Sequence, residues 1–218
     1  MNRPITATSF AIHEIKRLIV ERTLEPGQKI DQACLAERLN LSRLPIRQAL
    51  THLAEQNFIQ LRDHKSAIVT PVSGRDMRDL YALRCQLERW GLEQSFLAFS
   101  EELIATLEGL LGETERCVET DDHAKFMEFN RQFHFALYAV IDNPYTIASI
   151  KNLFDLSERY HWMCTSAPGM MEISHAEHRE MVDLIRRRDL DGFLGLSERH
   201  NCKTIEWVQE HGTIDVAE

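Results

Sequence analysis

The chain has 218 residues, of which 44% are hydrophobic, and carries a formal net charge of −9. This length and composition allow a buried core, which excludes a disordered chain, and no stretch approaches the roughly 18 apolar residues of a membrane-spanning helix. The start of the sequence lacks the charged and then apolar pattern of a signal peptide. The five cysteines are widely spaced without a Cys-x-x-Cys pair, so we expect a cytoplasmic protein with reduced thiols and no membrane partner.

The charge is unevenly distributed along the chain. Residues 1–75 contain 11 Lys and Arg against 7 Asp and Glu, a balance of +4, whereas the remaining residues contain 14 against 27, a balance of −13. A negative average argues against a polyanionic partner, but the position of the charges matters more than their sum. Only the first third of the chain is therefore a candidate for contact with nucleic acid.

This first third is predicted to form three short helices followed by a β-hairpin. Apolar residues recur at helical spacing, and proline, glycine and asparagine mark the turns between them. The predicted helices cover about residues 9–24, 31–39 and 42–56, and the hairpin strands cover 58–61 and 67–70. This order is typical of a winged helix-turn-helix domain, which we expect to span residues 1–72.

Residues 73–218 are predicted to form an all-α antiparallel bundle. Helical patterns follow one another from Gly74 onward, and no strand pattern intervenes. Short connections imply antiparallel neighbours. The breaks between six helices lie near Ser100, 120–122, 143–144, 167–174 and 189–191. The predicted fold class is therefore mainly α, with a DNA-binding domain followed by an effector-binding and dimerisation domain.

The third predicted helix has a polar side that carries two arginines. Its apolar stripe is committed to a core, which leaves four residues on the open side: Arg43, Arg47, Gln48 and Thr51. Arginine is the residue best shaped to contact phosphate or a guanine edge with two hydrogen bonds. His64 and Lys65 at the hairpin tip add a second candidate contact with DNA. An ordinary solvated basic surface is the alternative.

This helix opens with the run Ser-Arg-Leu-Pro-Ile-Arg-Gln-Ala-Leu at residues 42–50. The run resembles the start of the recognition helix in GntR-family bacterial transcription regulators. In that family the two arginines contact the operator, so the resemblance implies this role for Arg43 and Arg47, and a capping and phosphate-contacting role for Ser42. Two positions depart from the family pattern: Ala33 stands where an arginine is frequent, and Ser66 stands where the wing tip usually has glycine.

Three histidines of the predicted bundle lie on apolar helix faces. Asn130 and His134 are four residues apart and therefore stack on one face. His178 and His200 lie eleven residues before and after Asp189, the midpoint of a predicted helical hairpin, so antiparallel pairing places them level with each other. Three imidazoles and an amide oxygen form a candidate site for a divalent metal, with zinc favoured over nickel and manganese.

Interior hydrogen bonding is the alternative for each histidine, and His175 competes with His178 for the inward position. The segment from Asn130 to His134, with the later His178 and His200, resembles the FCD domain of the FadR subfamily. There, an Asp-x-x-x-His pair and two later histidines bind a divalent metal, which implies that Asn130, His134, His178 and His200 are ligands. Asn130 replaces the common aspartate, so an effector carboxylate could supply the missing anion, or the histidines could bind the effector without metal.

The first helix of the bundle carries one arginine in an otherwise apolar row. Arg84 shares this row with Met77, Leu80 and Leu87, and an inward guanidinium needs an anion. That anion is either a fixed Asp or Glu or the carboxylate of a bound metabolite. Effectors in the family are often small carboxylates or sugar acids, and a corresponding arginine lies near the pocket, which implies that Arg84 is an effector anchor.

These features favour a homodimeric regulator that binds a palindromic operator in double-stranded DNA and responds to a small organic acid in a metal-containing helical domain. A dimer is expected because one module makes too few phosphate contacts to bind tightly at physiological salt. Two alternatives stay open: a metal-dependent hydrolase using the three-histidine site, and a constitutive DNA-binding protein with a metal-free bundle. No acid or base beside the candidate ligands supports the hydrolase.

Overall fold

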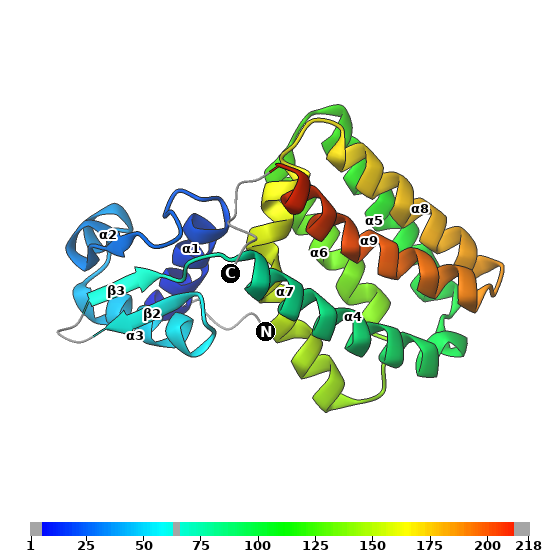
Figure 1. Ribbon diagram of the computed structural model, residues 1–218, viewed down its shortest axis with the longest axis horizontal. Coiled ribbons are helices and arrows are strands. Elements are labelled where there is room, and N and C mark those ends of the chain that lie inside the picture. The colour runs from blue at the N-terminus through cyan, green and yellow to red at the C-terminus, as the bar shows by residue number, and fades with distance from the viewer. Residues whose placement is uncertain (1–5, 63–65, 212–218) are drawn as a thin grey trace. The chain divides into compact units, whose positions relative to one another are not determined.

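The computed structural model describes residues 6–62 and 66–211. The chain divides between Ser73 and Gly74 into two compact units (Figure 1). Strands occur in the first unit, and the described part of the second unit is helical. No helix within the described ranges has the length and apolar character required to cross a membrane.

The first unit consists of three helices and a small antiparallel sheet. The helices are α1 (Ala7–Val20), α2 (Gln32–Arg38) and α3 (Arg43–Glu55), and the strands are β1 (Lys29–Ile30), β2 (Ile59–Arg62) and β3 (Ser66–Val69). Strand β3 lies in the middle and pairs with β1 on one side and with β2 on the other. Helices α1 and α2 both pack against α3, so the element order is that of the predicted winged helix-turn-helix domain.

Two features of this unit differ from the sequence-based expectation. Helix α1 ends at Val20 rather than near Leu24, because Arg22 adopts a left-handed conformation (φ 57°) and the backbone N–H of Leu24 bonds to the carbonyl of Leu18. The sheet has a third strand, β1, which is too short to show an alternating pattern. Both features depend on hydrogen bonds that form only in the folded unit: the bond from Leu24 to Leu18, and the pairing of β1 with β3.

A capping residue starts α2, and the turn between α2 and α3 contains a residue in the left-handed conformation. The carboxylate of Asp31 caps α2 by accepting hydrogen bonds from the backbone N–H groups of Ala33 and Cys34. Asn40 then adopts a left-handed conformation (φ 52°), as a sharp turn requires. Ser42 occupies the N-cap position of α3, but its side chain makes no capping hydrogen bond there.

The second unit contains the six predicted helices. They are α4 (Gly74–Ser95), α5 (Glu101–Glu119), α6 (His123–Tyr138), α7 (Pro144–Thr165), α8 (Met170–Arg186) and α9 (Leu190–His211), with a short 3-10 helix, η2 (Phe96–Ala98), after α4. Side chains of Ser100, Asp122 and Asn143 cap α5, α6 and α7. Helix α8 starts earlier than expected, directly after Gly169, whose positive φ of 81° forms the turn.

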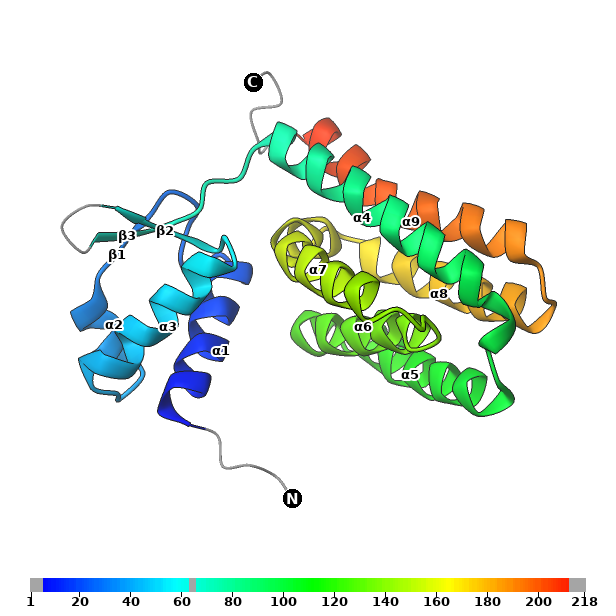
Figure 2. The same ribbon diagram turned by 90° about the horizontal axis from the view of Figure 1, so that it is seen from below.

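Helices from distant parts of the chain lie side by side in this unit. Helix α4 packs against α7 and α9, α5 packs against α6 and α8, and α8 packs against α9 (Figure 2). The apolar core includes the rings of Phe96, Phe99 and Phe193, whose centroids are 5.5–5.9 Å apart. This arrangement brings inward side chains from α4, α6, α7, α8 and α9 to one polar centre within the bundle.

Candidate functional site

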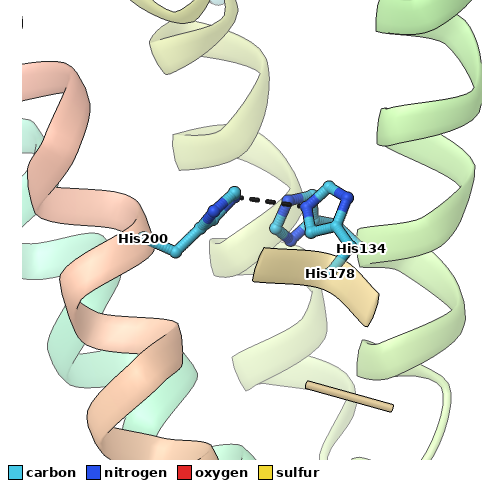
Figure 3. Close-up of side chains that lie close together, drawn as sticks. All are labelled: His134, His178 and His200. Atoms are coloured by element: carbon cyan, nitrogen blue, oxygen red, sulfur yellow. Dashed lines mark hydrogen bonds between the residues drawn. The ribbon is translucent and has the colours of Figure 1, made fainter. Parts of the chain in front are cut away.

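Three histidines converge inside the helical unit. His134 on α6, His178 on α8 and His200 on α9 are all buried, and one ring nitrogen of each lies within 4.8 Å of the others (Figure 3). The Nε2 atoms of His178 and His200 are 3.3 Å apart, so the two histidines predicted to be level across the hairpin are in contact. Imidazole nitrogens in such an arrangement are suitable ligands for zinc and similar divalent ions.

The surroundings of His134 and His178 favour neutral imidazoles. Burial lowers the pKa of His134 well below its usual value, and the neighbouring His178 and His200 lower it further. Burial also lowers the pKa of His178, followed by the effects of His200 and His161. A neutral imidazole keeps a lone pair on one nitrogen, which is the form that binds a metal ion.

Asn130 lies one helical turn before His134 and borders the same cavity. Its side chain is only 1% exposed, and its Oδ1 atom is buried without a hydrogen-bond partner in the described structure. A buried polar atom without a partner is costly, so it indicates a position for a ligand or a bound water. The chemistry of the donor set, three imidazoles and an amide oxygen, fits a divalent metal.

The cavity beside the histidines is small, with a volume of about 10 Å³, which is room for about one water molecule. Its lining is mostly polar and comes from α4, α6, α7 and α9: Tyr81, Arg84, Asn130, His134, Phe154, Ser157, Glu158, His161, His200, Asn201 and Thr204. His161 was not predicted as a site residue. Burial lowers its pKa to about 3, with smaller effects from His200 and Arg84, so it is a neutral hydrogen-bonding group.

His175, the competitor of His178, lies outside the cluster. Its Nδ1 is 2.9 Å from the hydroxyl of Thr114, and its Nε2 is 3.1 Å from a nitrogen of Arg179. It is therefore a buried histidine whose two ring nitrogens both have partners on α5 or α8. His178 takes the inward position that spacing alone left open.

Arg84 has a fixed anionic partner. It forms a buried ion pair with Glu88, one turn further along α4, at 2.5 Å, and the two side chains are 5% and 2% exposed. Its other nitrogens donate to Ser157 and Asn201 at 2.7 and 3.2 Å. The sequence left two possible anions for Arg84, a fixed carboxylate of the protein or the carboxylate of a metabolite. The structure contains the fixed carboxylate, and Arg84 also borders the cavity.

Sequence reasoning did not identify three residues that hold the histidines directly or through a hydrogen bond: Glu177, Tyr138 and Glu88. Glu177 accepts a hydrogen bond from Nδ1 of His200 at 2.8 Å, and Tyr138 lies 3.4 Å from Nδ1 of His134 while donating to Glu88 at 2.7 Å. The spacing of Arg84 and Glu88 could have indicated their pairing, because residues four apart meet on a helix. The roles of Tyr138 and Glu177 have no comparable local signal.

The first unit presents the predicted DNA-contacting face on α3. The five described residues assigned to this face are exposed: Ser42, Arg43, Arg47, Gln48 and Thr51. Neither Arg43 nor Arg47 has an ion-pair partner among the residues that the structure describes. Gln48 accepts a hydrogen bond from Thr8 at 2.7 Å, which links α3 to α1. His64 and Lys65 lie outside the described residues.

A winged helix-turn-helix unit joined to a helical unit with a buried polar centre defines a DNA-binding regulator. The chain matches the "Bacterial regulatory proteins, gntR family" over residues 7–69 and the "FCD domain" over residues 79–201. It belongs to the GntR family of bacterial transcription regulators and carries an FCD domain. These matches account for both units.

Known relatives span nearly the whole chain. The HTH-type transcriptional repressor RspR of Escherichia coli is 24% identical over 208 residues, which cover 95% of this chain and 90% of RspR. The regulator YdhC of Bacillus subtilis is 24% identical over 205 residues, covering 92% and 91% of the two chains. The solved structure of E. coli McbR/YncC has a TM-score of 0.82 at 19% identity and covers 96% of this chain and 100% of that one, which shows the same fold.

The buried ion pair leads to a prediction about stability. Replacing Arg84 with Met leaves Glu88 buried without its cation, so we expect the free energy of unfolding to fall by about 3–5 kcal/mol. The double variant Arg84→Met/Glu88→Gln is expected to recover part of this loss. Urea denaturation measures both, and Arg75→Met is the control, because Arg75 and Asp79 form a pair of which both members are 76% exposed. A loss at Arg84 no larger than at Arg75 would contradict the structural role.

Proposed function

We propose that this chain is a cytoplasmic regulator of the FadR subfamily whose operator affinity is controlled by a small metabolite bound in the helical unit. The observation that carries the proposal is the convergence of three buried imidazoles beside a polar cavity in a chain that also has a helix-turn-helix unit. Neither feature alone separates a sensor from a constitutive DNA-binding protein. Their combination favours a sensor.

In this proposal His134, His178 and His200 hold a divalent metal, zinc being the first candidate, and Asn130 contributes its amide oxygen. The buried Oδ1 without a partner supports the role of Asn130. A bound ion would supply positive charge at one end of the cavity. The residues of the chain hold that ion, exclude water by their burial, and leave the ligand set without a negative charge.

The cavity favours a small polar anion as the effector. Its charged lining residues have counter-ions, because Arg84 pairs with Glu88 and Glu158 pairs with Arg131. Neutral hydrogen-bonding groups such as Ser157, Asn201 and Thr204 make up much of the rest. The described cavity has room for about one water molecule, so an organic acid would bind only after the lining moves apart. Its carboxylate would then face the metal and its hydroxyls these side chains, while Arg84 would contribute a guanidinium edge.

The exposed side of α3 is proposed to enter the major groove of the operator. Arg43 and Arg47 are one helical turn apart near the start of the helix, which is where recognition helices contact base edges. Ser42, whose hydroxyl makes no capping bond within the described unit, would contact phosphate. Gln48 and Thr51 would extend the face, and the proposal gives His64 and Lys65 the backbone contact of the wing.

A homodimer completes the proposal, because two half-sites of a palindrome require two copies of α3. Helix α4 offers a surface for the contact between copies. Leu83 and Trp90 lie seven residues apart, and therefore on the same side of α4, and are 53% and 48% exposed. Large apolar side chains on one exposed stripe are more typical of an interface than of a solvated helix.

The DNA-binding role predicts a specific loss on mutation of α3. Arg47→Ala is expected to weaken operator binding by about 1–3 kcal/mol without unfolding the protein, because one contact with a base edge or phosphate disappears. Fluorescence anisotropy with duplexes selected from host genomic DNA measures the affinity. Arg75→Ala removes the same charge from α4 and is the control. Equal affinities of wild type and Arg47→Ala would remove Arg47 from the recognition face.

If the histidines hold a metal that the effector needs, their replacement should reduce both the zinc content and the response to effector. His178→Ala and His200→Ala are each expected to reduce the zinc content of the purified protein, measured by elemental analysis. They should also reduce the change in duplex affinity that a panel of hydroxy and sugar acids causes, whereas His175→Ala should retain both properties. Full zinc content in both variants would refute the ligand assignment. Hydrolysis that is lost in His134→Ala would instead favour the hydrolase.

The dimer role predicts that a charge on the α4 stripe separates the copies. Trp90→Glu is expected to convert a dimer to a monomer in analytical ultracentrifugation, since a buried carboxylate opposes association. Operator affinity should then fall roughly 10²-fold or more, because bivalent binding is lost. Ile173→Glu, at an exposed apolar residue of α8, is the matched control. An unchanged dimer in Trp90→Glu would place the interface elsewhere.

A further inference from the structure

Two of the three clustered imidazoles have a polar partner at Nδ1. In His200 this atom lies 2.8 Å from Oε2 of Glu177. The other oxygen of Glu177 forms an ion pair with Lys203. An ionised carboxylate only accepts hydrogen bonds, so Nδ1 of His200 carries a proton, and in the neutral, metal-binding form of the ring Nε2 carries the lone pair.

For His134, a longer chain of hydrogen bonds also indicates that the proton lies on Nδ1. The carboxylate of Glu88 accepts from Arg84 at 2.5 Å and from Asn201 at 2.7 Å, and it also accepts from the hydroxyl of Tyr138 at 2.7 Å. The hydroxyl proton of Tyr138 is thereby committed to Glu88. Its oxygen, 3.4 Å from Nδ1 of His134, can then only accept, which favours the form of His134 with its proton on Nδ1.

His178 has the opposite arrangement. Its Nδ1 is buried and has no hydrogen-bond partner within the described structure, and its Nε2 is 3.3 Å from Nε2 of His200. Because Nε2 of His200 is an acceptor, His178 must donate the proton of this contact (Figure 3). The metal-free cluster therefore contains one proton at its centre, on Nε2 of His178.

From these contacts we infer that Tyr138, backed by Glu88, and Glu177 are positioning residues for the metal centre. They fix the protons of His134 and His200 on Nδ1, so that the Nε2 atoms of both neutral rings keep their lone pairs in the metal-free protein. His178 would bind an ion through Nε2 only in its other neutral form, with the proton on Nδ1. This inference rests on the proposed metal-binding function, and it assigns roles that the ligands alone do not explain.

The proton positions can be observed directly in the metal-free protein. Long-range ¹H–¹⁵N correlation spectra of ¹⁵N-histidine-labelled full-length protein distinguish the two neutral forms of imidazole. We expect the Nδ1–H form for His134 and His200 and the Nε2–H form for His178. An Nε2–H form at His134 or His200 would overturn the inference, whether or not the protein binds metal.

Variants of the two supports test their effect on the centre. Tyr138→Phe removes the acceptor for His134 and keeps the ring. In Glu177→Gln, Lys203 attracts the amide oxygen and turns the NH₂ group toward His200, which then favours its Nε2–H form. Each variant is expected to lose zinc affinity by about 10- to 100-fold in competition with a chromophoric chelator, and to show the altered proton position in the spectrum.

Matched controls separate this effect from a general loss of structure. Tyr145→Phe and Glu180→Gln change exposed residues of the same types on α7 and α8 and should bind zinc like the wild type. Wild-type zinc affinity in both Tyr138→Phe and Glu177→Gln would overturn the positioning role while leaving the metal site intact. A wild type that binds no zinc but has the expected proton positions would refute the metal function and support the tautomer assignment.

Discussion

The buried ion pair between Arg84 and Glu88 is the interaction on which the helical unit depends. Two charges removed from water are tolerated only when their remaining hydrogen-bonding groups are satisfied. Here the guanidinium also donates to Ser157 on α7 and Asn201 on α9, and the carboxylate accepts from Asn201 and from Tyr138 on α6. One network therefore connects four helices and constrains how they pack.

This network also reaches the histidine cluster, which joins the stability of the bundle to the geometry of the site. Tyr138 is the link, because it donates to Glu88 and lies beside His134. Asn201 is a second link, since it follows His200 directly on α9 and bonds to both members of the ion pair. A shift of α4 or α9 would therefore reach the histidines through Tyr138 and Asn201. Such sensitivity suits a domain whose shape responds to a small ligand.

Sequence reasoning succeeded where local periodicity decides the structure. The six helices of the bundle and the three helices of the first unit follow from apolar spacing and from capping residues such as Ser100 and Asn143. The level placement of His178 and His200 follows from hairpin geometry. The early end of α1, the strand β1 and the supports Tyr138 and Glu177 could not be predicted, because they depend on side-chain orientations and contacts between distant segments.

The neutral ligand set gives a physical reason for metal and effector to act together in the proposed regulator. Three imidazoles and the amide of Asn130 leave a divalent ion with its full charge in a buried position, which is unfavourable without an anion. The carboxylates near the cavity are already paired: Glu88 with Arg84, and Glu158, which lines the cavity, with Arg131. An effector carboxylate would complete the charge balance, and the coupling is reciprocal: whatever the metal adds to effector affinity, the effector adds to metal affinity. An aspartate in place of Asn130 would weaken that coupling, because the ion would already have a fixed negative partner.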